Sequence, residues 1–304
     1  MRPLFGVSGR CAAAPFLGLI GGYPVGAKTV VALYDGGDCT AEEAERLLSF
    51  CNCSGPAFLL GVVGAGVFAS VKIGLLLLLS HVLSALAVGV LFRKRKGTPG
   101  AATTSRRSSS GTVRERVPFA KLLVDAVSSS FTSVLGVCGF ILFFSVLLEA
   151  LRVSGVLPAA ASLLGRVFTF SGVSSEGFEK LLMGLVEVTS GVTKLSPSDG
   201  LSFAVPAASF LLGFGGLSVH CQVLSVCSGR KLRLNSYFLG KLLHGVLSAL
   251  LTALLLRITP IGEAAFCLLS APDPLLANSL YCWITGCGFA ALLLTGTILL
   301  YWKH

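Results

Sequence analysis

The chain has 304 residues, of which 54% are hydrophobic and only 12% are charged, and its mean hydropathy is +0.84. Soluble domains carry roughly 25% charged residues, so this composition excludes an ordinary water-soluble globular protein. Much of the net charge of +10 comes from residues 93–121, where nine lysines and arginines stand against Glu115. No aromatic residue interrupts the charges between Lys94 and Val117, which argues against nucleic-acid binding and for a topological signal.

The first apolar segment, Ala12–Leu33, is interrupted by glycine and proline and then by a lysine. The residues that we assign to a binding site here are Gly22, Tyr23, Pro24, Gly26 and Lys28. Irregular backbone at membrane depth must be buried in protein or line a wet cavity, so this break is expected to line a cavity. An ammonium in an apolar region is expensive unless paired, which makes Lys28 a candidate counter-charge for an anion. The alternative is that Lys28 extends to the membrane interface.

A short amphipathic helix is predicted from Ala41 to about Phe50, because Thr40 and Glu43 form a capping-box pattern. Gly55 and Pro56 end it, and a new half-helix is expected to begin at Pro56. The site residues assigned to this second break are Asn52, Ser54, Gly55 and Pro56.

Ten cysteines are scattered through the chain without a Cys-x-x-Cys pair, and we interpret them as small packing residues. Cys51 and Cys53 flank Asn52, but no second pair of ligands lies nearby in the sequence. We therefore predict no metal site and no cofactor.

Four uninterrupted apolar segments are long enough to cross a hydrocarbon core of about 30 Å. They are Ile73–Phe92, Phe131–Leu151, Tyr237–Leu256 and Leu280–Trp302. The basic segment 93–121 follows the first of them, and the positive-inside rule places it in the cytoplasm. The predicted units are a first repeat with a transmembrane helix (1–92), the basic linker (93–121), a second repeat (122–257), and a loop with a C-terminal transmembrane helix (258–304).

In the second half, an ionisable residue again stands beside a break. The residues assigned here are Glu187, Thr189, Ser190, Gly191 and Lys194. We expect Glu187 to have a functional role and Lys194 to act as a second counter-charge. Glu187 could instead form a buried ion pair with Lys28 or Lys194 that fixes helix register, and Lys194 could extend to the interface.

A last break is predicted at Gly215 and Gly216, followed by Ser218, His220 and Gln222. His220 near a cavity could contact a solute. The alternative for this histidine is a hydrogen bond between helices.

Each half contains a glycine-rich interrupted segment ending in a lysine and then a Phe-x-x-x-x-Gly element with a further apolar segment. Paired broken segments of this kind are typical of secondary transporters built from inverted repeats, with the substrate site where the broken helices meet. The predicted fold is an all-α polytopic membrane protein with roughly eight membrane segments, as estimated from segment length. No catalytic motif is present in the sequence, so we do not expect an enzyme.

The blocks Gly22–Lys28, Arg46–Asn52, Ser54–Pro56 and Gly213–His220 together resemble the YlbJ-type sporulation integral membrane proteins. That family is identified with the "nucleoside recognition" or gate domain. The resemblance implies a sporulation role in a cell or forespore membrane, with a small organic anion such as dipicolinate as cargo. Family members carry transmembrane helices before the first motif, so the resemblance also implies that these N-terminal helices are missing here.

Three functions follow from these observations. The first is transport of a small organic anion through a cavity between two gate repeats, and the second is a nucleoside or nucleobase permease. The third is a non-transporting membrane scaffold in spore envelope assembly. The expected partners are the lipid bilayer and a small anionic solute or nucleoside. No nucleic acid is expected, and the sequence is compatible with a homo-oligomer.

Overall fold

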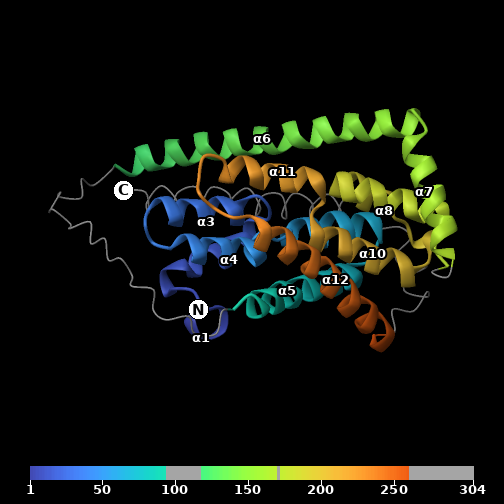
Figure 1. Ribbon diagram of the computed structural model, residues 1–304, viewed down its shortest axis with the longest axis horizontal. Helices are drawn as coiled ribbons and strands as arrows, with labels where there is room; N and C mark the ends of the chain where they lie inside the picture. Colours follow the sequence, from blue (N-terminus) through green and yellow to red (C-terminus); the bar gives the residue numbers. More distant parts are fainter. Residues whose placement is uncertain (94–117, 170–171, 260–304) are drawn as a thin grey trace.

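The computed structural model describes residues 1–93, 118–169 and 172–259, and every regular element in these ranges is helical (Figure 1). Within these ranges, four stretches are long and apolar enough to cross a membrane: α5 (Val71–Leu91), α6 (Phe119–Val153), Leu201–Cys227 and α12 (Asn235–Ile258). They confirm the predicted all-α membrane protein. The predicted span Leu280–Trp302 lies outside the described residues.

The order of elements is the same in the two halves of the chain. Each half has two broken helix pairs followed by one long apolar helix. The first half contains α2 (Ala13–Gly21), α3 (Val25–Asp35), α4 (Ala41–Cys51), the π-helix η2 (Phe58–Val67) and α5. The second contains α8 (Ser175–Val186), α9 (Val188–Lys194), α10 (Leu201–Phe214), α11 (Gly216–Cys227) and α12. The remaining short elements are α1 (Arg2–Phe5), η1 (Gly9–Ala12), α7 (Val156–Val167) and η4 (Pro197–Asp199).

The local signals for helix ends are confirmed. Helix α4 begins after Thr40, whose side chain accepts from the Glu43 amide while the Glu43 carboxylate accepts from the Thr40 amide. It ends at Cys51, and helix resumes at Pro56. The other breaks fall at Gly22–Pro24, at Glu187 and at Gly215. Capping side chains and glycines therefore decide where these helices stop.

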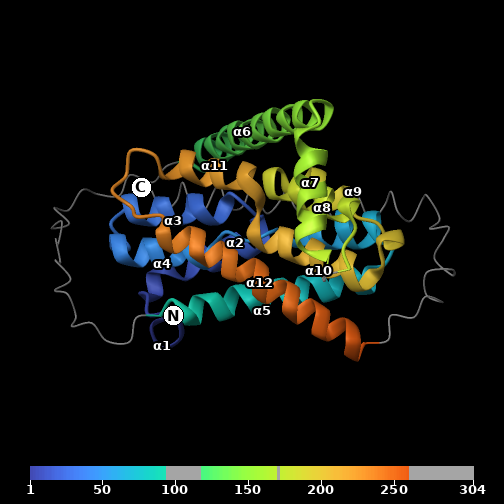
Figure 2. The same cartoon turned by 45° about the vertical axis from the view of Figure 1, so that its right-hand side comes forward.

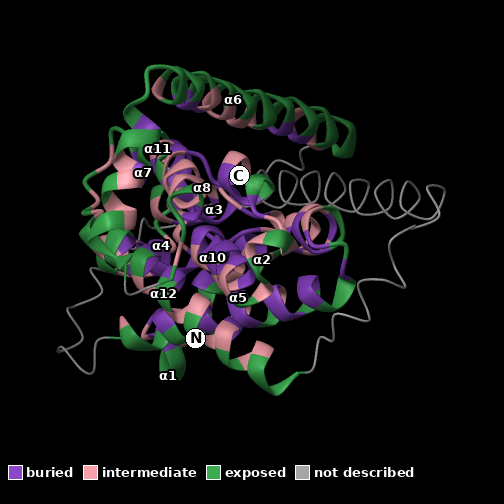
Figure 3. Ribbon diagram, turned by 90° about the vertical axis from the view of Figure 1, so that its right-hand side faces the viewer, coloured by how far each residue is buried: buried purple, intermediate pink, exposed green. Residues whose placement is uncertain are grey.

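Helix α6 contains the predicted span Phe131–Leu151 and extends beyond it on the N-terminal side, to Phe119. The serine- and threonine-rich turn does not interrupt it, because Thr132 and Ser133 each donate a hydroxyl to the carbonyl four residues back. Figure 3 shows that most of α6 is exposed. The helix packs along one edge of the bundle, mainly against α7, α8 and α11.

Helix α12 crosses the bundle and contacts α10, α5 and α4 (Figure 2). It thus joins both halves of the chain. One apolar cluster lies around α3 and α4 and includes Tyr237 of α12. A second cluster lies around η2, α5, α9 and α10.

Glycines let several backbones touch. A Cβ atom on Gly26 would fall far inside van der Waals contact with the carbonyl oxygen of Cys51, so α3 packs directly on the end of α4. Nothing lies within 4 Å of the equivalent position at Gly136 of α6. We expect Gly26→Ala to lower the free energy of unfolding by about 1–3 kcal/mol, the usual cost of overpacking. Gly136→Ala should be neutral or stabilising by up to about 1 kcal/mol, because alanine favours helix. Thermal unfolding of both variants in detergent tests this, and equal melting temperatures would contradict it.

Candidate functional site

A stripe of polar side chains runs along the buried face of α12. Its members are Tyr237, Lys241, His244, Ser248 and Thr252, each with 0% of its surface exposed. Their spacing of four, three, four and four residues places them on one side of a helix. Polar groups inside an apolar segment are costly unless they have partners or a function. The stripe is therefore the strongest indication of a functional site.

Lys241 connects α12 to the break after α4. Its Nζ donates a hydrogen bond of 2.9 Å to the carbonyl oxygen of Asn52. No Asp or Glu within the described ranges forms an ion pair with Lys241. The side-chain amide of Asn52 is buried beside the Tyr237 hydroxyl, but it makes no hydrogen bond of good geometry to a described residue. A buried cation therefore sits beside a buried amide with hydrogen-bonding capacity to spare.

The first two breaks meet at a small cavity. Gly22 has φ +74°, and a Cβ atom there would lie 3.1 Å from the backbone nitrogen of Gly55. The cavity of about 230 Å³ is lined by Ile20, Gly21, Gly22, Tyr23, Ser54, Gly55, Ala57, Phe58 and Thr189. Thr189 belongs to the second half of the chain, so both halves contribute to this cavity. Five of the predicted site residues are brought together here.

Glu187 is buried, with 1% of its surface exposed, and it caps α9. Its carboxylate accepts hydrogen bonds from the backbone amides of Thr189 (3.1 Å) and Ser190 (2.6 Å). The protein's own carboxylate thus satisfies the amides at this helix start, which a solute anion would otherwise contact. The alternative ion pair of Glu187 with Lys28 or Lys194 is not formed.

The two lysines predicted as counter-charges, Lys28 and Lys194, do not lie beside the polar stripe of α12. Lys194 is exposed at the end of α9. Lys28 is half-buried, and its Nζ donates a hydrogen bond of 2.5 Å to the hydroxyl of Ser133 on α6. The structure therefore assigns to Lys241 the buried position that the sequence assigned to these two lysines.

The predicted residues of α11 are all buried in a regular helix. Nδ1 of His220 lies 2.8 Å from the Tyr237 hydroxyl, which is the interhelical hydrogen bond of the alternative interpretation. His220 Nε2, the Ser218 hydroxyl and Gln222 Oε1 have no hydrogen-bond partner in the described part of the chain. Gly215, which has φ +96°, packs against the Lys241 stem, so α11 starts beside the lysine.

The remaining predicted residues shape the backbone. Gly26, Gly191 and Gly216 lie in close contacts with other backbones, where a side chain would not fit. Pro24 precedes the first residue of α3, and Pro56 begins the helix that leads into η2. These residues hold the cavity wall in place.

Comparison with known proteins identifies the family of the chain. No family model matches the chain, and no solved structure matches it. The curated "Sporulation integral membrane protein YlbJ" of Bacillus subtilis (strain 168) is 34% identical over 269 residues, which are 84% of this chain and 66% of the relative. The chain belongs to the YlbJ-type family. It is an integral membrane protein that spans just under two thirds of its relative's length.

For this YlbJ-type protein, sequence reasoning missed Lys241 and gave little weight to His81 and His244. One signal was available for all three, because an ionisable residue inside an apolar span is a functional candidate by default. Lys241 stands within the predicted span Tyr237–Leu256, where the uninterrupted apolar pattern indicates an ordinary helix.

Proposed function

We propose that the protein is a sporulation-associated membrane transporter that carries a small organic anion, such as dipicolinate, through a site beside Lys241. The observation that carries this proposal is a fully buried lysine without a carboxylate partner among the described residues, bonded to the break after α4. Burial of an unpaired charge costs several kcal/mol. An anionic solute would offset this cost.

The dimensions of the neighbouring cavity favour a small solute. Its volume of about 230 Å³ lies below the roughly 300–1,000 Å³ of pockets that bind drug-sized ligands. Ser54 lines this cavity and is two residues from Asn52, whose carbonyl oxygen binds Lys241. A compact dicarboxylate in this cavity could contact the hydroxyls of Tyr23 and Ser54, which have no hydrogen-bond partner of good geometry in the described ranges. Lys241 is bonded to Asn52 and does not itself line the cavity, so its charge would act on the solute from behind the break.

We further propose that the two halves form inverted gate repeats with roughly eight membrane segments, a number set by segment length. The repeated order of elements supports this, as does the meeting of breaks from both halves at one cavity. The location is a cell or forespore membrane with segment 93–121 in the cytoplasm, which the basic composition supports.

A nucleoside or nucleobase permease is the second candidate. The buried amides of Asn52 and Gln222 favour it, because amides recognise base edges by paired hydrogen bonds and both have hydrogen-bonding atoms without a partner of good geometry among the described residues. An amide next to a lysine can also bind a carboxylate. We therefore prefer an anionic solute over a nucleoside, because only an anion would balance the charge of Lys241.

Uptake into proteoliposomes tests the proposal. Purified protein should accumulate radiolabelled dipicolinate at least tenfold above protein-free vesicles, and unlabelled uridine should not compete. Uridine uptake without dipicolinate uptake would establish the permease. Flux of neither solute, from protein shown to be folded, would overturn transport of both solute classes and favour the scaffold in spore envelope assembly.

A further inference from the structure

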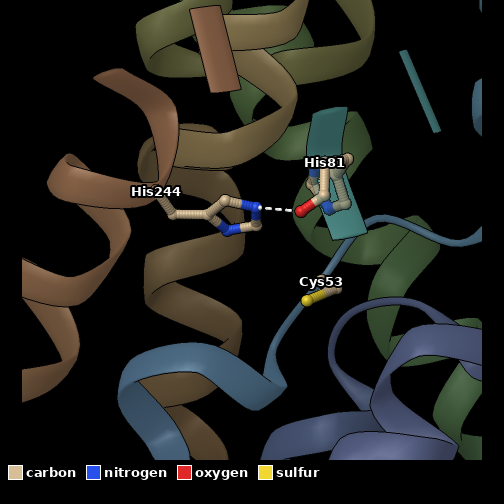
Figure 4. A group of neighbouring side chains, drawn as sticks. All are labelled: Cys53, His81 and His244. Atoms are coloured by element: carbon tan, nitrogen blue, oxygen red, sulfur yellow. Dashed lines mark hydrogen bonds between the residues drawn. The ribbon is translucent and has the colours of Figure 1, made fainter. Parts of the chain in front are cut away.

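Three potential metal ligands meet in the centre of the bundle. They are Cys53 in the break after α4, His81 on α5 and His244 on α12 (Figure 4). Cys53 Sγ and one nitrogen of each histidine all lie within 4.8 Å of one another, and all three residues are buried. The sequence offered only Cys51 and Cys53 as neighbours, so the two histidines could be found only from the fold.

One nitrogen of each imidazole is engaged and the other is unpaired. His244 Nε2 lies 3.0 Å from the carbonyl oxygen of His81 and must donate its proton there (Figure 4). His244 Nδ1 therefore presents a lone pair, and it has no hydrogen-bond partner in the described ranges. A backbone carbonyl that orients a histidine through its second nitrogen is the usual outer-shell arrangement of a metal ligand.

His81 is oriented differently. Its Nε2 accepts a hydrogen bond of 2.9 Å from the backbone amide of Ser54, so the neutral ring carries its proton on Nδ1. Ligation through Nδ1 requires this proton to move to Nε2, and the Ser54 amide then loses its acceptor. Three metal–ligand bonds more than offset the loss of this one hydrogen bond, even though the Ser54 amide is buried.

We infer that Cys53, His81 and His244 bind a thiophilic divalent cation of the Zn²⁺ class, at a site that adjoins the proposed solute pathway and shares none of its three ligands with it. Bonds of about 2.0–2.3 Å in a tetrahedral zinc site place its ligand atoms about 3.3–3.8 Å apart. The three residues need to close by only about 1 Å to reach this geometry. A Cys-His-His set with an open fourth position suits zinc and excludes magnesium and calcium, which take oxygen ligands.

Lys241 donates a hydrogen bond to the carbonyl oxygen of Asn52, the residue before Cys53, so its charge lies beside this site. Metal binding requires loss of the Cys53 thiol proton. One thiolate leaves Zn²⁺ with a net charge of +1. We therefore expect an exogenous anion, such as chloride or hydroxide, in the fourth coordination position.

Binding at this site is coupled to the cavity. Ser54, whose amide must release His81, also lines the cavity between the two halves. Metal binding would therefore remove a hydrogen bond that holds the cavity wall at Ser54. A divalent cation would act on the solute site through this one backbone amide.

Cobalt provides the test, because Co²⁺ bound to a thiolate gives a sulfur-to-metal charge-transfer absorption band. We expect one equivalent of Co²⁺ per chain to produce this band in the full-length protein in detergent, and equimolar Zn²⁺ to remove it. Cys53→Ala should abolish the band. The matched control Cys51→Ala removes a buried thiol two residues away and should retain it.

Two further variants separate this site from adventitious binding and from a folding defect. Cys138→Ala should keep the band, which rules out an adventitious site at that exposed thiol. His244→Asn should lower Co²⁺ affinity at least tenfold while size-exclusion profiles and circular dichroism stay those of the native protein. The inference is overturned if the native protein shows no thiolate band with excess Co²⁺, or if the band survives Cys53→Ala. None of these readouts depends on transport, so failure of the proposed function leaves the test intact.

Discussion

Replacement of Lys241 by methionine is expected to reduce dipicolinate uptake by about 10²-fold or more, the effect of losing roughly 3–5 kcal/mol from one partner of a buried charge pair. Methionine keeps a long apolar stem but removes the charge that selects for an anion. The free energy of unfolding should stay the same or rise, because apolar replacement of buried charges is often stabilising. Activity and stability therefore move in different directions, which a merely structural lysine would not produce.

Two other lysines provide the comparison. Lys231 is exposed in the loop before α12, and Lys231→Met should change initial uptake less than twofold. Lys194→Met separates the two site assignments, since the sequence placed this residue in the site and the structure places it on the surface. Uptake at wild-type rates by Lys241→Met, or its loss in Lys194→Met, would reject Lys241 as the counter-charge.

Removal of the Glu187 carboxylate should have the second large effect, and this effect is on stability. Glu187→Ala leaves the amides of Thr189 and Ser190 without their acceptor, and we expect the free energy of unfolding to fall by about 2–4 kcal/mol. Glu187→Gln keeps one acceptor oxygen and should lose about half as much. Thermal unfolding in detergent measures both variants.

The control for Glu187 is Glu42→Ala, which removes an exposed carboxylate from the first turn of α4. Exposed substitutions of this kind stay within about 0.5 kcal/mol. If Glu187→Ala unfolds at the temperature of the native protein yet loses uptake, the carboxylate acts on the solute or on a coupled proton instead of capping α9.

Local signals made the breaks predictable. Thr40 and Glu43 form a capping box within four residues and so mark a helix start. Pro56 and Gly215 restrict or permit the backbone angles of their own residues, which is enough to place a helix end. Such features need no knowledge of the fold, and the structure confirms them. The predicted span Phe131–Leu151 lies within α6, and the helix continues on its N-terminal side because serines and threonines there bond to their own helix and do not stop it.

The site depends on which way side chains point, and the sequence does not contain that directly. Lys28 and Lys194 follow matching breaks, but helix rotation directs one toward α6 and the other outward. Lys241 comes from a helix without any break, and only the crossing of α12 over α4 brings it to Asn52. The meeting of Cys53, His81 and His244 requires the same crossing.

The length of helix α6 also allows residues of the bundle to be positioned relative to the membrane surface. Its 35 residues extend about 52 Å at 1.5 Å per residue, which exceeds a hydrocarbon core of about 30 Å. Lys121 and Asp125 favour water or headgroups, so we expect the hydrocarbon to begin near Phe131 and the first turns of α6 to project beyond it. On this placement Ser133 and its hydrogen-bond partner Lys28 lie at the interface.

The same placement orders the elements packed near Lys28. The exposed ion pair of Arg230 with Asp35, at the end of α3, then stands on the aqueous side of this level. The break at Gly22–Pro24 precedes Lys28 in the chain, and on the same placement we expect it on the other side, within the bilayer. The expected order from the water inward is then an ion pair, an interfacial lysine and the broken helix that lines the cavity.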